Sequence, residues 1–132
     1  MKEIAIKWLK QGLHELEMAK RNIEIEGYDV AAFLAHQSVE KLLKSLFAVE
    51  GKEIPKIHYL DELAKTLNLP DELIDEIIEL TVDYTFARYP DVSEKTPYEE
   101  YTEEMAKEKV KIAEKVFEAL KDRYKSLLEE KT

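Results

Sequence analysis

Apolar residues recur at alternating spacings of three and four positions along most of this chain, which is the pattern of amphipathic α-helices. The most regular stripe lies in about residues 99–129 and consists of Ala106, Val110, Ala113, Phe117, Leu120, Tyr124 and Leu127. Similar stripes run through residues 2–26 and 29–50. Three Gly and four Pro among 132 residues leave little material for tight turns. The pattern therefore predicts an all-α fold and argues against an all-β one.

Glycine and proline residues divide this pattern into separate helices. Gly27 is expected to end the first helix and Gly51 the second, because glycine readily adopts the left-handed conformation that follows many helices. The connector after Gly51 cannot continue a helix through Pro55, and a short helix around residues 59–67 should follow it. The first two helices are therefore expected to form an antiparallel hairpin.

The second half of the chain supplies two more long helices. One is expected to begin at Pro70, since proline is tolerated in the first turn of a helix. It should end near Arg88, because Pro90 disfavours helical geometry in the residue before it. Residues 91–97 should form a loop before the last helix. We expect an up-and-down antiparallel bundle of four long helices and one short helix, in a single domain over residues 1–132.

The apolar stripes also predict the core and an oligomeric state. A helix over residues 99–129 would be about 45 Å long at about 1.5 Å per residue, which is longer than a small bundle covers. We therefore expect part of it to pack on a second copy of the chain, so that the protein is a homodimer. The expected core contains Leu9, Leu16, Val39, Leu42, Leu46, Ile77, Ala113, Phe117 and Leu120.

Charge is distributed unevenly along the chain. The net charge is −9, and residues 52–100 hold thirteen acidic and five basic residues. Such a surface suits a basic protein partner, whereas RNA, a polyanion, is not expected as a ligand. No apolar run approaches the roughly 20 residues of a membrane span, so we expect a cytoplasmic protein without membrane association. Abundant Lys and Glu with no Cys also fit a thermostable protein.

Three histidines, His14, His36 and His58, are the obvious candidates for metal ligands. None has Glu three residues before it, as di-iron helical bundles require, and no two lie four residues apart, as in zinc proteases. The chain also has no Cys and no glycine-rich phosphate-binding loop. We therefore expect no metal and no cofactor.

Two polar residues fall on the apolar side of the second helix. At 100° per residue, His36 lies inside the apolar arc and Glu40 lies at its edge. A buried carboxylate needs a cationic or hydrogen-bonding partner, which another helix is expected to supply. The two residues either form a hydrogen-bonded pair that fixes the helix register or line the edge of a polar pocket.

The segment from Tyr84 to Asp91 combines aromatic, basic and acidic side chains where the fourth helix should end. Tyr84 and Arg88 lie four residues apart and so face the same way. Arg88 either pairs with Asp91 or Glu40 and anchors the loop, or clamps a phosphate or carboxylate. The site hypothesis is a cleft between the second helix and the end of the fourth, lined by His36, Glu40, Lys44, Tyr84, Arg88 and Asp91.

Two short motifs resemble the prokaryotic HEPN domain family. They are His-Gln-Ser-Val-Glu-Lys at 36–41 and Ala-Arg-Tyr-Pro-Asp at 87–91, and the resemblance around them covers nearly the whole chain. The resemblance implies an α-helical bundle that is usually a homodimer. It also implies either nucleotide binding beside a minimal nucleotidyltransferase partner, commonly in a toxin-antitoxin-like pair, or metal-independent cleavage of RNA.

The RNA-cleaving branch of this family carries an Arg followed, after four to six intervening residues, by a catalytic His. None of Arg21, Arg88 and Arg123 has a His at that spacing. The sequence therefore favours a non-catalytic module that binds a nucleotide, a nucleotidyltransferase partner protein, or both. Two alternatives remain open: a ribonuclease in which Arg88 and His36 converge in space, and a purely structural interaction protein.

Overall fold

The computed structural model describes residues 2–88 and 95–129, apart from the side chains of residues 82–88 and 97. These residues form helices joined by turns and connectors, without any strand in the described ranges, so the predicted all-α fold is confirmed. The helices are α1 (Lys2–Glu24), α2 (Tyr28–Val49), α3 (Leu60–Thr66), α4 (Asp71–Arg88), α5 (Pro97–Glu100) and α6 (Glu103–Glu129).

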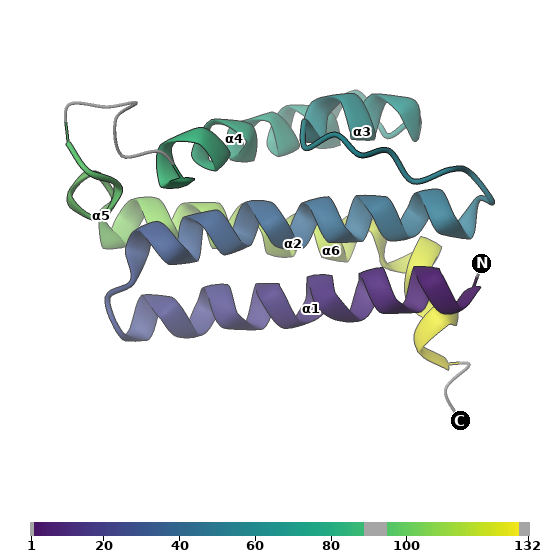
Figure 1. Ribbon diagram of the computed structural model, residues 1–132, viewed down its shortest axis with the longest axis horizontal. Helices are drawn as coiled ribbons and strands as arrows, with labels where there is room; N and C mark the ends of the chain where they lie inside the picture. Colours follow the sequence, from purple (N-terminus) through teal and green to yellow (C-terminus); the bar gives the residue numbers. More distant parts are fainter. Residues whose placement is uncertain (1, 89–94, 130–132) are drawn as a thin grey trace.

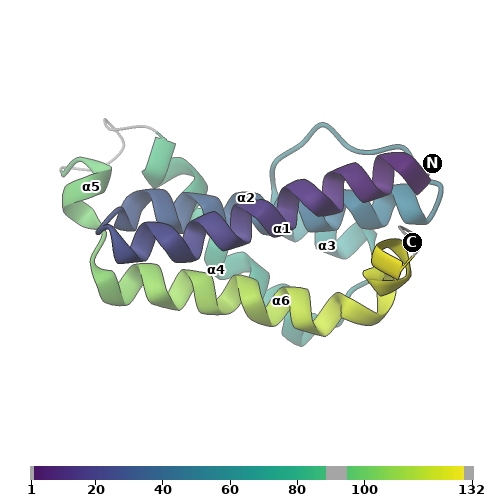
Figure 2. The same ribbon diagram turned by 90° about the horizontal axis from the view of Figure 1, so that it is seen from below.

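The four long helices α1, α2, α4 and α6 form an up-and-down antiparallel bundle, as predicted (Figure 1). Helices α2 and α6 lie in the middle, and each contacts all three of the other long helices. Helix α1 lies on one side of this pair, and α4 with the short α3 lies on the other side (Figures 1 and 2). Within the described residues α1 and α4 therefore have no contact with each other.

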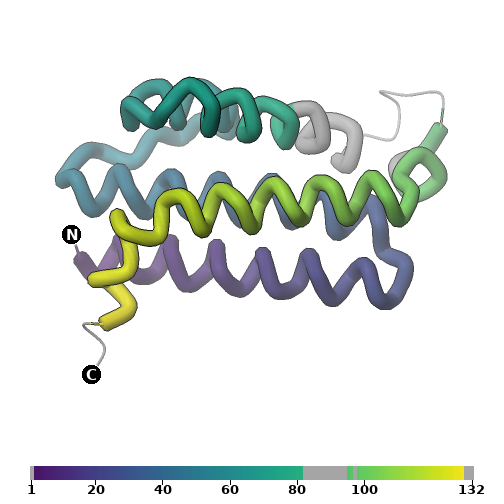
Figure 3. The backbone as a smooth tube through the Cα atoms, turned by 180° about the vertical axis from the view of Figure 1, so that it is seen from behind, coloured from purple at the N-terminus to yellow at the C-terminus, as the bar shows by residue number. Residues whose placement is uncertain are grey.

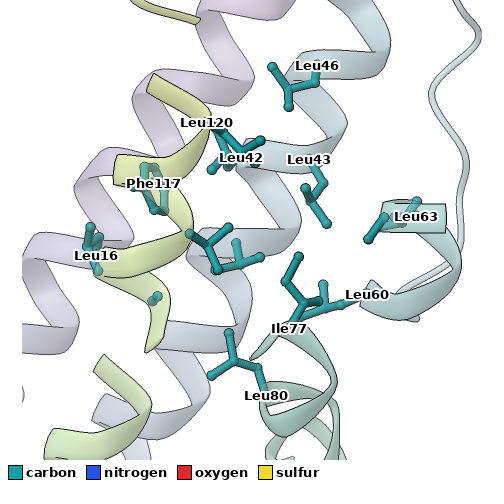
Figure 4. Close-up of a cluster of buried hydrophobic side chains, with 14 of the residues drawn as sticks. Leu16, Leu42, Leu43, Leu46, Leu60, Leu63, Ile77, Leu80, Phe117 and Leu120 are labelled. Atoms are coloured by element: carbon teal, nitrogen blue, oxygen red, sulfur yellow. The ribbon is translucent and has the colours of Figure 1, made fainter. Parts of the chain in front are cut away.

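The core lies along α2, where the apolar faces of the other helices meet. All nine residues that the sequence placed in the core are buried, so that prediction is confirmed. Leu60 and Leu63 of α3 and Ile77 and Leu80 of α4 add a second layer on the side of α2 away from α1 (Figure 4). The amphipathic pattern is thus satisfied mainly by packing against one central helix.

Helices α1 and α2 approach each other most closely at Gly12. A Cβ atom at this position would lie 3.1 Å from the carbonyl oxygen of Ser38 and 3.2 Å from the Cβ of Lys41. Both distances are shorter than ordinary van der Waals contacts between such atoms. Gly12 therefore serves close helix packing in the middle of α1, where its backbone flexibility alone would weaken the helix.

The glycine at the end of α2 behaves as the sequence predicted, whereas the glycine after α1 does not. Gly51 has the expected positive φ of 73°. The described part of α4 reaches Arg88, and the residues beyond it, where the sequence placed the end of this helix, lie outside the described range. The first turn differs, because Glu26 adopts the left-handed conformation with φ 64° and Gly27 has φ −88°. Gly27 is instead confined by Asn22, whose Oδ1 would lie 2.9 Å from an added Cβ. Close approach, rather than a positive φ, explains this glycine.

The last helix begins later than the sequence predicted. Residues 97–129 form the short α5 and the long α6, and Thr102 Oγ1 accepts a hydrogen bond from the Met105 N–H at 3.2 Å, as an N-cap does. The C-terminal turns of α6 bend toward the N-terminal end of α1 (Figure 3). The whole predicted stripe, up to Leu127, is buried within one chain. The expectation that this helix needs a second copy to cover it is therefore not supported.

Candidate functional site

A buried carboxylate lies at the centre of the polar residues on α2. Glu40 is 2% exposed, so it is buried more completely than its place at the edge of the apolar arc indicated. Its Oε2 accepts hydrogen bonds from Lys44 Nζ at 2.9 Å and from His58 Nδ1 at 2.8 Å. Lys44 is one turn further along α2, and His58 lies in the connector that precedes α3. We call these three residues the Glu40 cluster.

The partners of Glu40 decide its charge. Burial alone would raise the pKa of this carboxyl, but hydrogen bonds from Lys44 and His58 outweigh burial and hold its pKa below the ordinary value. The carboxylate is therefore ionised at neutral pH and acts only as an acceptor. Its second oxygen, Oε1, is buried and has no hydrogen-bond partner among the residues whose side chains are described.

The side chain of Lys44 lies in the interior of the protein. Its side chain is 5% exposed, and its Nζ lies 5.6 Å from the centre of the Trp8 ring on α1, within the range of a cation–π contact. The ammonium thus joins Glu40 to α1. A ligand phosphate cannot reach Lys44 in this arrangement, so the cation predicted for the site serves the protein's own carboxylate.

His36 is fully buried, as predicted, and has no solvent-facing surface. Its Nδ1 lies 3.1 Å from the side-chain oxygen of Gln37. Burial lowers the pKa of this imidazole to about 4, although the nearby Glu40 acts in the opposite direction. His36 is therefore neutral at physiological pH and is enclosed by the core.

The other three residues of the site hypothesis lie at or beyond the end of α4. Tyr84 and Arg88 belong to the last two turns of that helix, but their side chains are outside the described part of the chain, and Asp91 is outside it altogether. The structure thus brings Glu40 and Lys44 into direct contact, with His36 one turn before Glu40. The cleft between α2 and the end of α4 stays a prediction.

The sequence missed the role of His58 in this cluster. His58 is 18 residues from Glu40, its side chain is half exposed, and it packs on α2 only because the connector runs back along that helix (Figure 1). The signal that was present was the demand of Glu40 for a partner. Helical periodicity could not point to a partner in an irregular segment.

A second concentration of charge lies on the surface between α4 and α6. A groove of about 520 Å³ is lined there by Glu72, Asp75, Glu76, Glu79, Glu108, Lys111, Ile112 and Lys115. We call it the acidic groove. An ion pair between the two helices joins Lys115 Nζ and Glu76 Oε1 at 3.6 Å, and both side chains are well exposed. Within the described residues, no cluster of three or more potential ligands is arranged to hold a metal ion.

Comparison with known families decides which class of helical bundle this is. The family model of the HEPN domain matches residues 5–123, which is nearly the whole chain. The chain belongs to the HEPN domain family. The family that the two short motifs indicated is thereby confirmed over nearly the whole chain of this HEPN protein. Among its described helices, none is long and apolar enough to cross a membrane.

Solved structures agree with this assignment. The HEPN protein is 33% identical to the archaeal HEPN homologue ST0689, with a TM-score of 0.78 over 90% of this chain and 96% of that one. It is 27% identical to TT1696 from Thermus thermophilus, with a TM-score of 0.83 over 90% and 97%. A HEPN domain protein of Thermotoga maritima, tm0613, shares the fold at 24% identity, with a TM-score of 0.70 over 88% and 95%. No curated protein matches the sequence.

Proposed function

We propose that this HEPN protein is a non-catalytic module that binds a nucleotide, a nucleotidyltransferase partner protein, or both, in a toxin-antitoxin-like pair. Membership of the HEPN family supports considering two activities, because the resemblance implies either this binding function or RNA cleavage. The sequence contains no Arg and His at the spacing of the cleaving branch. An RNA-cleaving site would therefore have to form from residues distant in the sequence.

The observation that carries the proposal is the burial of His36. A ribonuclease that used Arg88 and His36 would need an imidazole that touches the RNA and exchanges protons near neutral pH. His36 is 0% exposed, and its pKa is lowered to about 4 by burial. Both properties suit a core residue and neither suits a general base, so the non-catalytic alternative is favoured.

The charge of the surface bears on the partner. The acidic groove presents five carboxylates and two lysines, which supports a basic protein partner and disfavours RNA.

We also propose a homodimer, for which the support is the family. The apolar stripe of α6 gives no support, because the chain covers it by itself.

The absence of ribonuclease activity is tested with purified protein and labelled RNA in the presence of a chelator. We expect no cleavage above the level of the His36→Asn variant. Cleavage that disappears with His36→Ala, while circular dichroism stays helical, would promote the ribonuclease alternative. His58→Ala serves as a matched control, because it changes the more exposed histidine on the connector.

Binding is tested in two further experiments. Calorimetric titration with adenine and guanine nucleotides measures the ligand directly. Co-expression with a nucleotidyltransferase encoded next to this gene, followed by size-exclusion chromatography with light scattering, measures the complex. The free protein is expected at twice the chain mass of 15.5 kDa, and a monomer mass at micromolar concentration would contradict the homodimer.

A further inference from the structure

Helices α4 and α6 lie side by side, but of the contacts between neighbouring long helices in the described ranges theirs is the least extensive (Figure 3). A second hollow of about 410 Å³ lies between them, beside the acidic groove. Residues that line this hollow and not the acidic groove are Pro70, Leu73, Ala119, Leu120 and Arg123. We call it the Ala119 hollow.

The acidic groove and the Ala119 hollow are continuous, because Glu72, Glu76 and Lys115 line both. We call the two together the α4–α6 groove. Its lining runs from residue 70 to 79 on α4 and from 108 to 123 on α6. At about 1.5 Å per residue these stretches are roughly 15 and 24 Å long, which matches a further helix of about three to four turns.

Uncompensated negative charge lies at the end of this groove away from the Ala119 hollow. Asp75, Glu79 and Glu108 are exposed there beside one lysine, Lys111, and none of the three carboxylates forms an ion pair with a described side chain. Other acidic residues of α6 are neutralised by a neighbour: Glu103, Glu114 and Asp122 each lie within 3.2 Å of a lysine Nζ. The acidic end of the groove can therefore receive cations from another molecule.

The Ala119 hollow is mainly apolar. Leu120 is buried beneath it, Leu73 is partly buried at its side, and Ala119 is exposed with only a methyl group. The short alanine side chain leaves space for an apolar side chain from outside. A ligand that fills the whole groove therefore needs an apolar surface at one end and positive charge at the other.

We propose that the α4–α6 groove binds an amphipathic helix of a basic partner protein. Apolar side chains of that helix enter the Ala119 hollow, and its Lys or Arg side chains face Asp75, Glu79 and Glu108. The inference rests on the proposed function and names the surface that its protein partner uses. Charge complementarity selects this occupant, because a second copy of the chain has a net charge of −9 and RNA is a polyanion.

The probe is a labelled synthetic peptide of leucine and lysine in which the leucines lie on one face of a helix. Fluorescence anisotropy measures its binding to the full-length protein at low and at high salt. One control peptide has the same composition with the leucines spread around the helix, and another has glutamate in place of lysine. We expect only the first peptide to bind, and to bind more weakly at high salt.

The apolar end is tested with two variants that introduce the same side chain. Ala119→Arg fills the hollow with a long cation and should weaken binding of the peptide by about tenfold or more. Ser126→Arg places an arginine at another exposed position of α6, outside the groove, and should leave the affinity within about twofold. Circular dichroism and the thermal midpoint of each variant check the fold.

The acidic end is tested by removing two charges at a time. Asp75→Asn combined with Glu79→Gln should weaken binding by about fivefold at low salt, and by much less at high salt. Glu104→Gln combined with Glu118→Gln removes the same charge from exposed positions of α6 outside the groove. This control pair should change the affinity by about twofold or less.

The same variants are tested in the complex with the nucleotidyltransferase encoded next to this gene. A complex that forms equally well with the wild-type chain and with every groove variant would overturn the groove as the docking site, while the proposed function stands. No binding of the helical peptide, or equal weakening in groove and control variants, would also overturn it. A change of oligomeric mass in Ala119→Arg would show that a second copy fills the groove, and would overturn the basic helix. Peptide binding that the groove variants weaken, without any complex, would remove the nucleotidyltransferase and leave the groove.

Discussion

Charge is organised in opposite ways in the Glu40 cluster and in the acidic groove. In the cluster one carboxylate is buried with two donors within 2.9 Å. In the groove five acidic side chains share two lysines, and the ion pair between the helices is 3.6 Å long and exposed. Buried charges interact strongly and depend on every partner, whereas exposed charges are screened by water and salt. The cluster should therefore control stability, and the groove should control which partners approach.

The largest effect is expected from removing the cation of the cluster. Lys44→Ala leaves Glu40 ionised and buried with one donor fewer, which should lower the free energy of unfolding by about 3–5 kcal/mol. Urea denaturation followed by circular dichroism measures the loss. The double variant Glu40→Leu, Lys44→Met removes both charges at similar volume and should recover most of the stability. A double variant as unstable as Lys44→Ala would show that packing, and not the unpaired charge, causes the loss.

Acid should destabilise the protein through His36. Its pKa is about 4 in the folded chain against an ordinary value of 6.5, so the unfolded chain takes up a proton first as the pH falls. The stability is therefore complete above about pH 6.5 and declines between pH 6.5 and 4, by roughly 3 kcal/mol at about 1.4 kcal/mol per pH unit. The His36→Gln variant should have a flatter profile in this window. An equally steep profile in that variant would assign the acid sensitivity to other groups.

A smaller effect is expected from His58. His58→Ala removes one hydrogen bond to Glu40, but the imidazole is half exposed, so water can replace it in part. We expect a loss of about 1 kcal/mol in the same denaturation experiment. His58→Asn, which keeps a donor, should lose less. A loss larger than that of Lys44→Ala would reverse the order of the two donors.

The smallest effect on stability is expected in the acidic groove. Glu76→Gln removes an exposed partner of Lys115 and should change the free energy of unfolding by less than about 1 kcal/mol. The same change should weaken the binding of a basic partner at low salt and matter little at high salt. Thermal unfolding of the Glu76→Gln variant at two salt concentrations measures the change in stability. A large loss of stability that does not depend on salt would show that the acidic groove, like the Glu40 cluster, controls stability.

Residues that follow helical periodicity were predictable from the sequence. The nine core residues are buried, and both His36 and Glu40 lie inside the bundle. Each of these statements needs only the spacing of apolar residues. The start of α6 was missed although a signal was present, because Thr102 is followed by two Glu residues, as at many helix N-termini.

The partners of Glu40 were not predictable in the same way. Lys44 carries a charge, yet it is buried because its long side chain reaches both Glu40 and the Trp8 ring. His58 reaches Glu40 from a segment with no periodicity. The direction of the first turn, where Glu26 replaces glycine in the left-handed conformation, depends on how Asn22 packs on Gly27. Such details come from tertiary contacts.

The close packing of α1 on α2 at Gly12 also bears on how fast the chain folds. The two helices are adjacent in the sequence and make the most extensive contact in the bundle, so their contacts close only a short loop. This hairpin should form in the transition state, before α4 and α6 dock. Substitutions at Gly12 should then slow folding, whereas substitutions on α4 should mainly speed unfolding. Close packing at one glycine would in this way contribute to the rate at which the bundle assembles.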